Sequence, residues 1–277
     1  MANITASDVN KLRQQTGAGM MDCKKALVEA DGDFEKAVEI LRKKGQKVAS
    51  NRADRDAKEG VVLSKVNASA TLGAAIMFNC ETDFVAKNQE VVDFAYSILN
   101  IAIEKKPASL EALLALDFNG LSLNENITNM IGKTGEKLEV THYEFIEAPK
   151  VFAYIHPGNR LATLVGLNKA EGVDEVGKDI AMQVAAMAPI ALDKDDVDPS
   201  VVEKEIEIGK EQARQEGKPE DMLEKIAIGK LNKFYKESTL LNQEFIKDGK
   251  KNVLQVLQQV DKNLTVTAFK RLILGSR

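Results

Sequence analysis

The sequence predicts an α+β protein in which a small helical bundle precedes a core of two similar halves. Apolar residues in the first part of the chain, residues 1–45, recur only at helical spacing. Beyond Gly60 the pattern changes to short apolar strands that alternate with helices. The order of hairpin, helix and final strand then occurs twice, which indicates an internal repeat.

Composition excludes several classes of protein. Charged residues make up 29% of the 277 residues and the net charge is −4, so a general nucleic-acid coat is not expected. Cys23 and Cys80 stand alone in apolar surroundings, which predicts buried free thiols in a reducing compartment. The sequence shows neither a signal peptide nor an apolar run of the ~18–20 residues that span a membrane. We therefore expect a cytoplasmic protein that binds neither DNA nor membranes.

Residues 1–45 are the predicted N-terminal bundle of three helices. Thr5 is the expected N-cap of the first helix, the second spans 20–30, and the third spans 34–44 until Gly45 stops it. Residues 46–59 follow; they are polar, rich in charge and without a useful apolar stripe. We interpret 46–59 as a linker, helical at most in part, and as the first domain boundary.

The first half of the core is predicted over residues 60–150. Strands at 61–66 and 71–79 form a hairpin, a helix follows at 90–106, and a strand at 139–145 completes the sheet. We expect a three-stranded antiparallel sheet covered by helices.

The second half comprises residues 151–198 and 239–277. Its expected elements, in the same order as before, are strands at 151–156 and 161–168, a helix at 174–187 and a strand at 264–271. Residues 199–238 interrupt this plan with two charged helices joined at Gly217. Their apolar seam is narrow, which predicts an inserted antiparallel helical hairpin of the coiled-coil kind, suited to association.

The sequence lacks the groupings of residues that catalysis requires. Gly132-Lys133-Thr134 resembles the end of a phosphate-binding loop, but Ile127 stands where that motif needs glycine. His142 and His156 lie in different halves, with no cysteine or histidine at metal-ligand spacing. We therefore expect a binding protein rather than an enzyme, with no cofactor and no metal.

One stretch, Thr82-Asp83-Phe84-Val85, lies at a turn between a strand and a helix, where binding residues often concentrate. The large area of an aromatic ring favours burial of Phe84. The second half, however, has Ala170-Glu171-Gly172 at this place and no Asp-Phe pair, so the fold does not require that pair. We therefore predict that Phe84 is exposed and that Val85 faces inward.

Residues 16–27 (TGAGMMDCKKAL) and 82–88 (TDFVAKN) closely resemble signatures of the bacterial elongation factor Ts family, and the order of parts agrees over essentially the whole chain. The resemblance implies a guanine-nucleotide exchange factor that binds elongation factor Tu in its GDP-bound and nucleotide-free forms and does not itself bind nucleotide. It also implies a ubiquitin-associated-like N-terminal bundle. The alternative is a non-exchange scaffold or chaperone for a translation GTPase.

The resemblance also implies which residues contact the partner. Those that would disturb its magnesium site are Thr82, Asp83, Phe84 and Val85. The other implied contacts are Arg13, Met20, Met21, Lys24 and His156. Two departures from the family matter. Pro157 follows His156 in the hairpin turn, and the chain ends at Arg277, where many members continue into a helical module, so we expect that module's contact to be missing. Association of two copies through the helical hairpin stays open.

Overall fold

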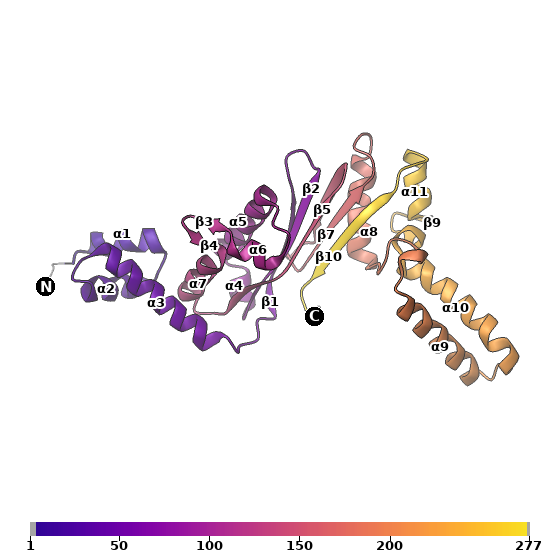
Figure 1. The fold of residues 1–277 in the computed structure, drawn as a ribbon, viewed down its shortest axis with the longest axis horizontal. Coiled ribbons are helices and arrows are strands. Elements are labelled where there is room, and N and C mark those ends of the chain that lie inside the picture. Colours follow the sequence, from indigo (N-terminus) through magenta and orange to yellow (C-terminus); the bar gives the residue numbers. More distant parts are fainter. Residues whose placement is uncertain (1–3, 276–277) are drawn as a thin grey trace. The chain divides into compact units, whose positions relative to one another are not determined.

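The computed structural model describes residues 4–275 (Figure 1). Helices α1 (Ala6–Thr16), α2 (Met20–Glu29) and α3 (Phe34–Arg52) form the N-terminal bundle. Thr5 and Asp8 form the capping box expected at the start of α1. The centre of the bundle is a small cluster of buried residues: Val9, Leu12, Cys23, Ala26, Leu27, Ala30 and Ala37.

The predicted end of α3 at Gly45 is wrong, because the helix continues to Arg52. Gly45 is buried where α3 crosses α7 (Leu123–Thr134), and a Cβ placed on Gly132 of α7 would lie 2.8 Å from Gly45 Cα. Glycine costs a helix interior only about 1 kcal/mol, which close packing of two helices can offset. Residues 46–52 are therefore helix, and the connection to the core is confined to 53–58.

The contacts divide the chain into two compact units. The first contains the described residues through Leu63, Ile76–Tyr143 and the chain from Ile273 onward; the second contains Ser64–Ala75 and Glu144–Leu272. This division cuts across the predicted halves, because the residues around the first hairpin group with the second unit. The backbone hydrogen bond from Val151 N to Ala70 O is one such contact. The predicted division into five parts stays a prediction.

The first sheet has the strand order β1-β2-β5, from Glu59–Val66, Leu72–Cys80 and Leu138–Glu147. All nine residues of the central strand β2 are buried, as its continuous apolar sequence predicts for a strand covered on both faces. Phe78 of β2 contacts Phe94 of α5 (Gln89–Lys105), with ring centroids 5.8 Å apart. This contact fixes α5 against the sheet.

The second sheet repeats this topology in the order β10-β7-β6, from Val266–Ile273, Leu161–Leu167 and Lys150–Ile155. Helix α8 (Asp174–Met187) covers it so closely that a Cβ on Gly177 would lie 2.1 Å from the ring of Phe152. The α+β fold class with two small three-stranded antiparallel sheets is thus confirmed, whereas the ubiquitin-associated-like and coiled-coil assignments stay predictions.

The repeat also includes a small hairpin in each half that the sequence did not predict. After α6 (Leu110–Ala115), strands β3 (Asp117–Phe118) and β4 (Leu121–Ser122) form a small hairpin that leads into α7. Strands β8 (Glu244–Phe245) and β9 (Asp248–Asn252) lead in the same way into α11 (Val253–Val260). Both helices begin with a capping box. These strands are too short to leave a periodic signal in the sequence.

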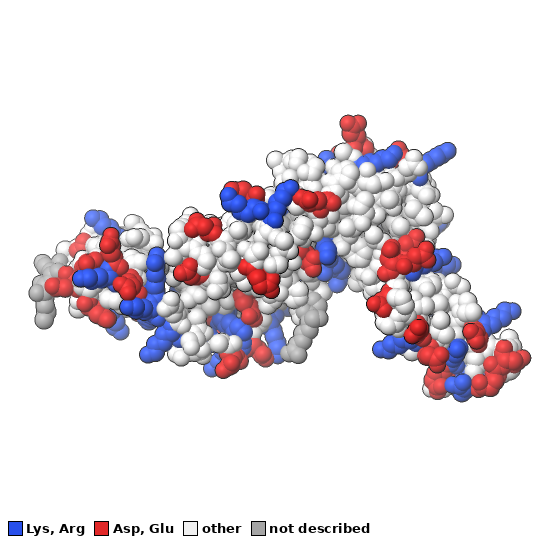
Figure 2. Space-filling model, viewed as in Figure 1, with Lys and Arg blue, Asp and Glu red and all other residues white. Residues whose placement is uncertain are grey.

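The insertion consists of α9 (Pro199–Gln215) and α10 (Leu223–Ser238), which run side by side in opposite directions (Figure 1). Acidic and basic side chains are interspersed over them on the face shown in Figure 2. The insertion begins and ends at neighbouring points of the second unit, where Leu240 N donates to Ala191 O and Ile190 N donates to Ser238 O. Among the described residues, no helix is both long and apolar enough to span a membrane.

Candidate protein-binding site

The 82–85 turn is a one-turn helix, α4 (Asp83–Ala86), rather than an irregular loop. Thr82 is its N-cap, and Thr82 Oγ1 accepts a hydrogen bond of 3.4 Å from Val85 N. Asn88 then caps α5 directly, by accepting from Glu90 N. Two caps within seven residues fix where the backbone turns, since each satisfies a free N–H group at a helix start.

The side chain of Phe84 projects from this short helix and is 82% exposed. Val85 is half-buried and Ala86 is buried, so these residues seal the turn against the core. The predicted exposure of Phe84 is therefore confirmed. A phenylalanine this exposed contributes little to the core of its own chain, and exposed large apolar side chains that gather on a surface mark interaction sites.

Asp83 stands beside Phe84 and pairs with Lys87 one turn later, at 2.6 Å between Oδ2 and Nζ. The hydrogen bond from the Lys87 ammonium lowers the pKa of the Asp83 carboxyl below its ordinary value. The carboxylate is thus charged at neutral pH and stands at the start of α4 next to an exposed ring.

Glu136 holds the turn from the opposite side. Its two carboxylate oxygens accept hydrogen bonds from Thr82 N (3.0 Å) and Thr82 Oγ1 (2.6 Å). Glu136 follows Gly135, which ends α7 in the left-handed conformation at φ 76°. Hydrogen bonds to an ionised carboxylate are the stronger kind, so Thr82 is held in a single position.

Glu81 supplies a second attachment. Its carboxylate accepts from Arg52 Nη1 of α3 at 2.9 Å and from Lys137 N at 2.7 Å. Sequence reasoning missed Arg52, Glu81 and Glu136, because their contacts join residues 29 to 56 positions apart. In the sequence, Arg52 belonged to an expected linker and Glu136 to a short charged run, and only the extended α3 brings Arg52 to Glu81.

Cys80 closes the base of the turn, where its Sγ donates to Thr82 O at 3.1 Å. Burial, together with the charge of Glu136, raises the pKa of this thiol to about 12. Both Cys80 and Cys23 are free and buried, as the sequence predicted. A thiol with such a pKa stays protonated and unreactive at neutral pH.

The other predicted contact residues of the first unit lie in the bundle. Met20 and Met21 open α2 and are 49% and 63% exposed. Lys24, one turn further, is exposed, and so is Arg13 in the last turn of α1. Exposed methionines suit an adaptable apolar contact.

His156 belongs to the second unit, in the hairpin between β6 and β7. It is exposed, and its Nδ1 is 3.0 Å from the hydroxyl of Tyr154. Gly158 at φ 91° and Asn159 at φ 54° close the turn that contains Pro157. Throughout residues 4–275, no three His, Cys, Asp or Glu side chains gather in a group that could hold a metal ion.

Comparison with known proteins gives a consistent result. A family model described as elongation factor TS matches residues 81–276. The elongation factor Ts of Amoebophilus asiaticus is 55% identical to this chain over 275 residues, which cover 99% of each chain. Those of Cytophaga hutchinsonii and Christiangramia forsetii are 53% and 51% identical, over 99% of this chain and 100% of each relative.

Proposed function

This chain belongs to the elongation factor Ts family, and from that membership we propose that it is a guanine-nucleotide exchange factor for elongation factor Tu. It binds the GDP-bound GTPase, promotes GDP release and lets GTP reload during translation elongation in the cytoplasm. It performs no chemical step and binds no nucleotide itself.

The observation that supports this proposal most strongly is the exposed Phe84 on a turn held by Glu136 and Glu81. An apolar ring that enters a groove of the partner gains the free energy of burial, about 1.5–3 kcal/mol for a phenylalanine. Because the turn is already ordered, binding spends little of that free energy on fixing it. The remainder is available to shift the partner's conformation.

Asp83 supplies the electrostatic part of the proposed mechanism. The 82–85 turn enters the partner near the Mg²⁺ that holds the GDP phosphates, where a bound divalent cation is often the largest local charge. A carboxylate beside that site disturbs the ligands or waters of the ion and so loosens the phosphates. Release is accelerated only if the factor binds the opened GTPase better than the GDP-bound one. The coupling is reciprocal, so bound nucleotide weakens the factor's hold equally.

The remaining predicted contacts are anchors in this proposal. Met20, Met21, Lys24 and Arg13 bind the GTPase from the bundle, and His156 binds it from the second unit. The hairpin of α9 and α10 also exposes apolar side chains and is the candidate surface for association of two copies; these are Ile208, Met222 and Ile228. Size-exclusion chromatography with light scattering tests that association.

The test is the release of fluorescently labelled GDP from purified elongation factor Tu. Phe84→Ala should slow release about 30-fold, the effect of losing a 2 kcal/mol contact at the centre of an interface, and Asp83→Ala should slow it less. Ile246→Ala removes a different exposed apolar side chain, 42% exposed in the second unit, and should leave release unchanged.

Two results would contradict the proposal. Release at the wild-type rate in both the Phe84 and Asp83 variants would exclude the 82–85 turn as the acting part. Binding of the wild-type chain to elongation factor Tu without any acceleration would favour a non-exchange scaffold or chaperone.

A further inference from the structure

The segment of residues 132–137 contacts both predicted partner-binding parts of the first unit, the bundle and the 82–85 turn. It is the stretch that begins with the discounted phosphate-loop-like Gly132-Lys133-Thr134 and continues through Glu136 to Lys137. We propose that this segment is a positioning element that fixes α2 and Phe84 as one body, so that docking of the bundle places Phe84 at the nucleotide site. This inference rests on the proposed exchange function.

The contact with the bundle starts at Gly132. A Cβ there would lie 2.8 Å from Gly45 Cα, a distance that two backbones cannot accommodate without moving apart. Helices α3 and α7 therefore approach closely at this point, because Gly132 has no side chain to hold Gly45 away.

Lys133 extends the contact to the turn between α1 and α2. Its ammonium pairs with Glu90 of α5, and its side chain passes so close to Gly17 that a Cβ on that glycine would meet Nζ and Cε. Gly17 is the left-handed residue that ends α1, at φ 66°. One lysine of α7 thus lies against both the turn that leads into α2 and the start of α5.

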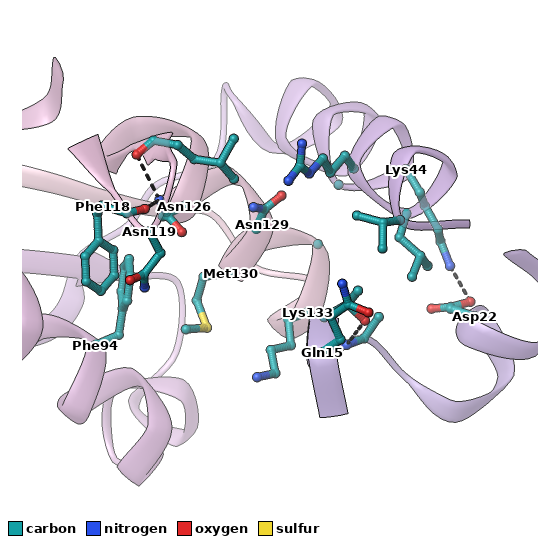
Figure 3. Close-up of a pocket in the computed structure, with 18 residues that line it drawn as sticks. Gln15, Asp22, Lys44, Phe94, Phe118, Asn119, Asn126, Asn129, Met130 and Lys133 are labelled. Carbon is teal, nitrogen blue, oxygen red and sulfur yellow. Dashed lines mark hydrogen bonds and ion pairs between the residues drawn. The ribbon is translucent and has the colours of Figure 1, made fainter. Parts of the chain in front are cut away.

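A cleft of about 380 Å³ lies beside this crossing, lined by residues of the bundle, α5, α7 and the β3–β4 hairpin. Figure 3 shows Gln15 and Lys133 extending into it, with Lys44 of α3 paired to Asp22 of α2 at one side. Beside this open space, the bundle meets the rest of the first unit through the close approach of Gly45 and Gly132, through Lys133, and through the pairing of Arg52 with Glu81. Removing one of them should therefore have a measurable effect.

The contact with the turn is made by the other end of the same segment. Glu136 accepts from Thr82 N and Oγ1, and Lys137 N donates to Glu81. Lys137 Nζ also donates to Arg55 O, in the connection after α3. Six consecutive residues therefore join the bundle, the connection that leaves it and the base of the turn.

The fixed arrangement of α2 and Phe84 should make exchange more efficient. When two contact surfaces are held at a fixed separation, binding of one raises the effective concentration of the other. Loss of the bundle contact should thus weaken productive docking, while loss of the turn contact should misplace Phe84 after docking. The two ends of the segment should give different kinetic signatures, which a general loss of stability would not produce.

The bundle end is tested with the single substitution Gly132→Ala in the full-length chain, and Gly229→Ala in α10 is the matched control. Both glycines lie inside helices, but a Cβ on Gly229 meets nothing within 4 Å. Gly132→Ala should raise the concentration of factor that gives half-maximal GDP release about tenfold, equivalent to 1.4 kcal/mol, and leave the maximal rate unchanged. Gly229→Ala should change neither. If Gly132→Ala does not fold, Lys133→Met is measured by the same criterion.

The turn end is tested with Glu136→Gln, against Glu104→Gln near the end of α5, whose carboxylate pairs with the neighbouring Lys105. Glu136→Gln should lower the maximal release rate about tenfold and leave the half-maximal concentration unchanged. Thr82→Val should do the same, and Thr82→Ser should restore the wild-type rate by keeping the hydroxyl donor. Circular dichroism shows whether each variant is folded.

Two results would overturn the inference. The first is wild-type kinetics in both tested variants, which are Glu136→Gln and folded Gly132→Ala (or Lys133→Met in its place). The second is an equal change of the half-maximal concentration and of the maximal release rate in both variants. The proposed function fails by a different result, which is the absence of any acceleration by the wild-type chain.

Discussion

The two halves of the core differ most where the central strand leads into the covering helix. In the second half β7 ends at Leu167, and the connection reaches α8 with Val173, which is 1% exposed and packs into the core. In the first half β2 ends at Cys80, and the connection carries Phe84, which is 82% exposed. The same topology therefore directs an apolar side chain inward in one half and outward in the other.

Both connections share one attachment. In the first half, Lys137 N, just before the last strand β5, donates to the Glu81 carboxylate. In the second, Thr265 N, just before the last strand β10, donates to Asn168 Oδ1 at 2.9 Å. The residue after the central strand thus holds the start of the last strand in each half. What the first half adds is α4, with Asp83 and Phe84, and this addition is unnecessary for closing the sheet.

The largest test of this comparison replaces residues 82–87 by the sequence Lys-Ala-Glu-Gly of the second half, with Glu81 retained. We expect a folded protein in which acceleration of GDP release is lost, since the attachment stays and the exposed ring goes. GDP release and a urea unfolding curve check the two parts of this expectation. A chimera that still accelerates release would show that the first half's connection is not the acting part.

Phe78 and Phe84 give the next largest contrast, because they lie six residues apart and are 1% and 82% exposed. Phe78→Ala should lower the free energy of unfolding by about 3–5 kcal/mol, because it leaves a cavity against Phe94. Phe84→Ala should change it by less than about 0.5 kcal/mol, as for other surface substitutions. Urea unfolding of both variants measures the difference, and comparable destabilisation would mean that Phe84 belongs to the core.

The smallest expected effect concerns the pairing of Asp83 with Lys87. The hydrogen bond from Lys87 lowers the pKa of Asp83 below its ordinary value of 3.8. Its contribution to stability is therefore present above 3.8 and is lost as the pH falls through the lowered pKa. Lys87→Gln should move the NMR titration of the Asp83 carboxyl to higher pH, and salt should shrink the shift in the wild type. The carboxyl of Asp33, which caps α3 in the bundle, should titrate at the same pH in the Lys87→Gln variant as in the wild type and serves as the control.

Local patterns in the sequence were sufficient for the bundle helices, for the strands of the two three-stranded sheets and for the helices that cover them. The continuous apolar run of β2 and the capping residues Thr5 and Asp33 are signals within a few neighbouring residues. The comparison of the halves also predicted an exposed Phe84. The predicted end of α3 was wrong, because the sequence alone does not distinguish a glycine that stops a helix from a glycine that lets two helices touch. Only the presence of Gly132 opposite Gly45 distinguishes them.

The site was predictable only in part for a related reason. Residues that contact a partner stand in a contiguous motif, whereas those that hold the motif are scattered. Glu136 and Arg52 are 54 and 29 residues away from the positions they contact. A charged side chain that anchors a distant turn has the same local surroundings in the sequence as one that is merely solvated.

Ala191 and Thr239, near the two ends of the α9–α10 insertion, pair with each other. This pairing affects how the protein can evolve. Because the two ends of the α9–α10 insertion meet at one place, a lineage can lengthen, shorten or replace the hairpin without disturbing a strand of the sheet. Changes of sequence and length can therefore accumulate in the hairpin, which does not support the core. The hairpin can acquire or lose an association surface while the 82–85 turn and its attachments are inherited intact.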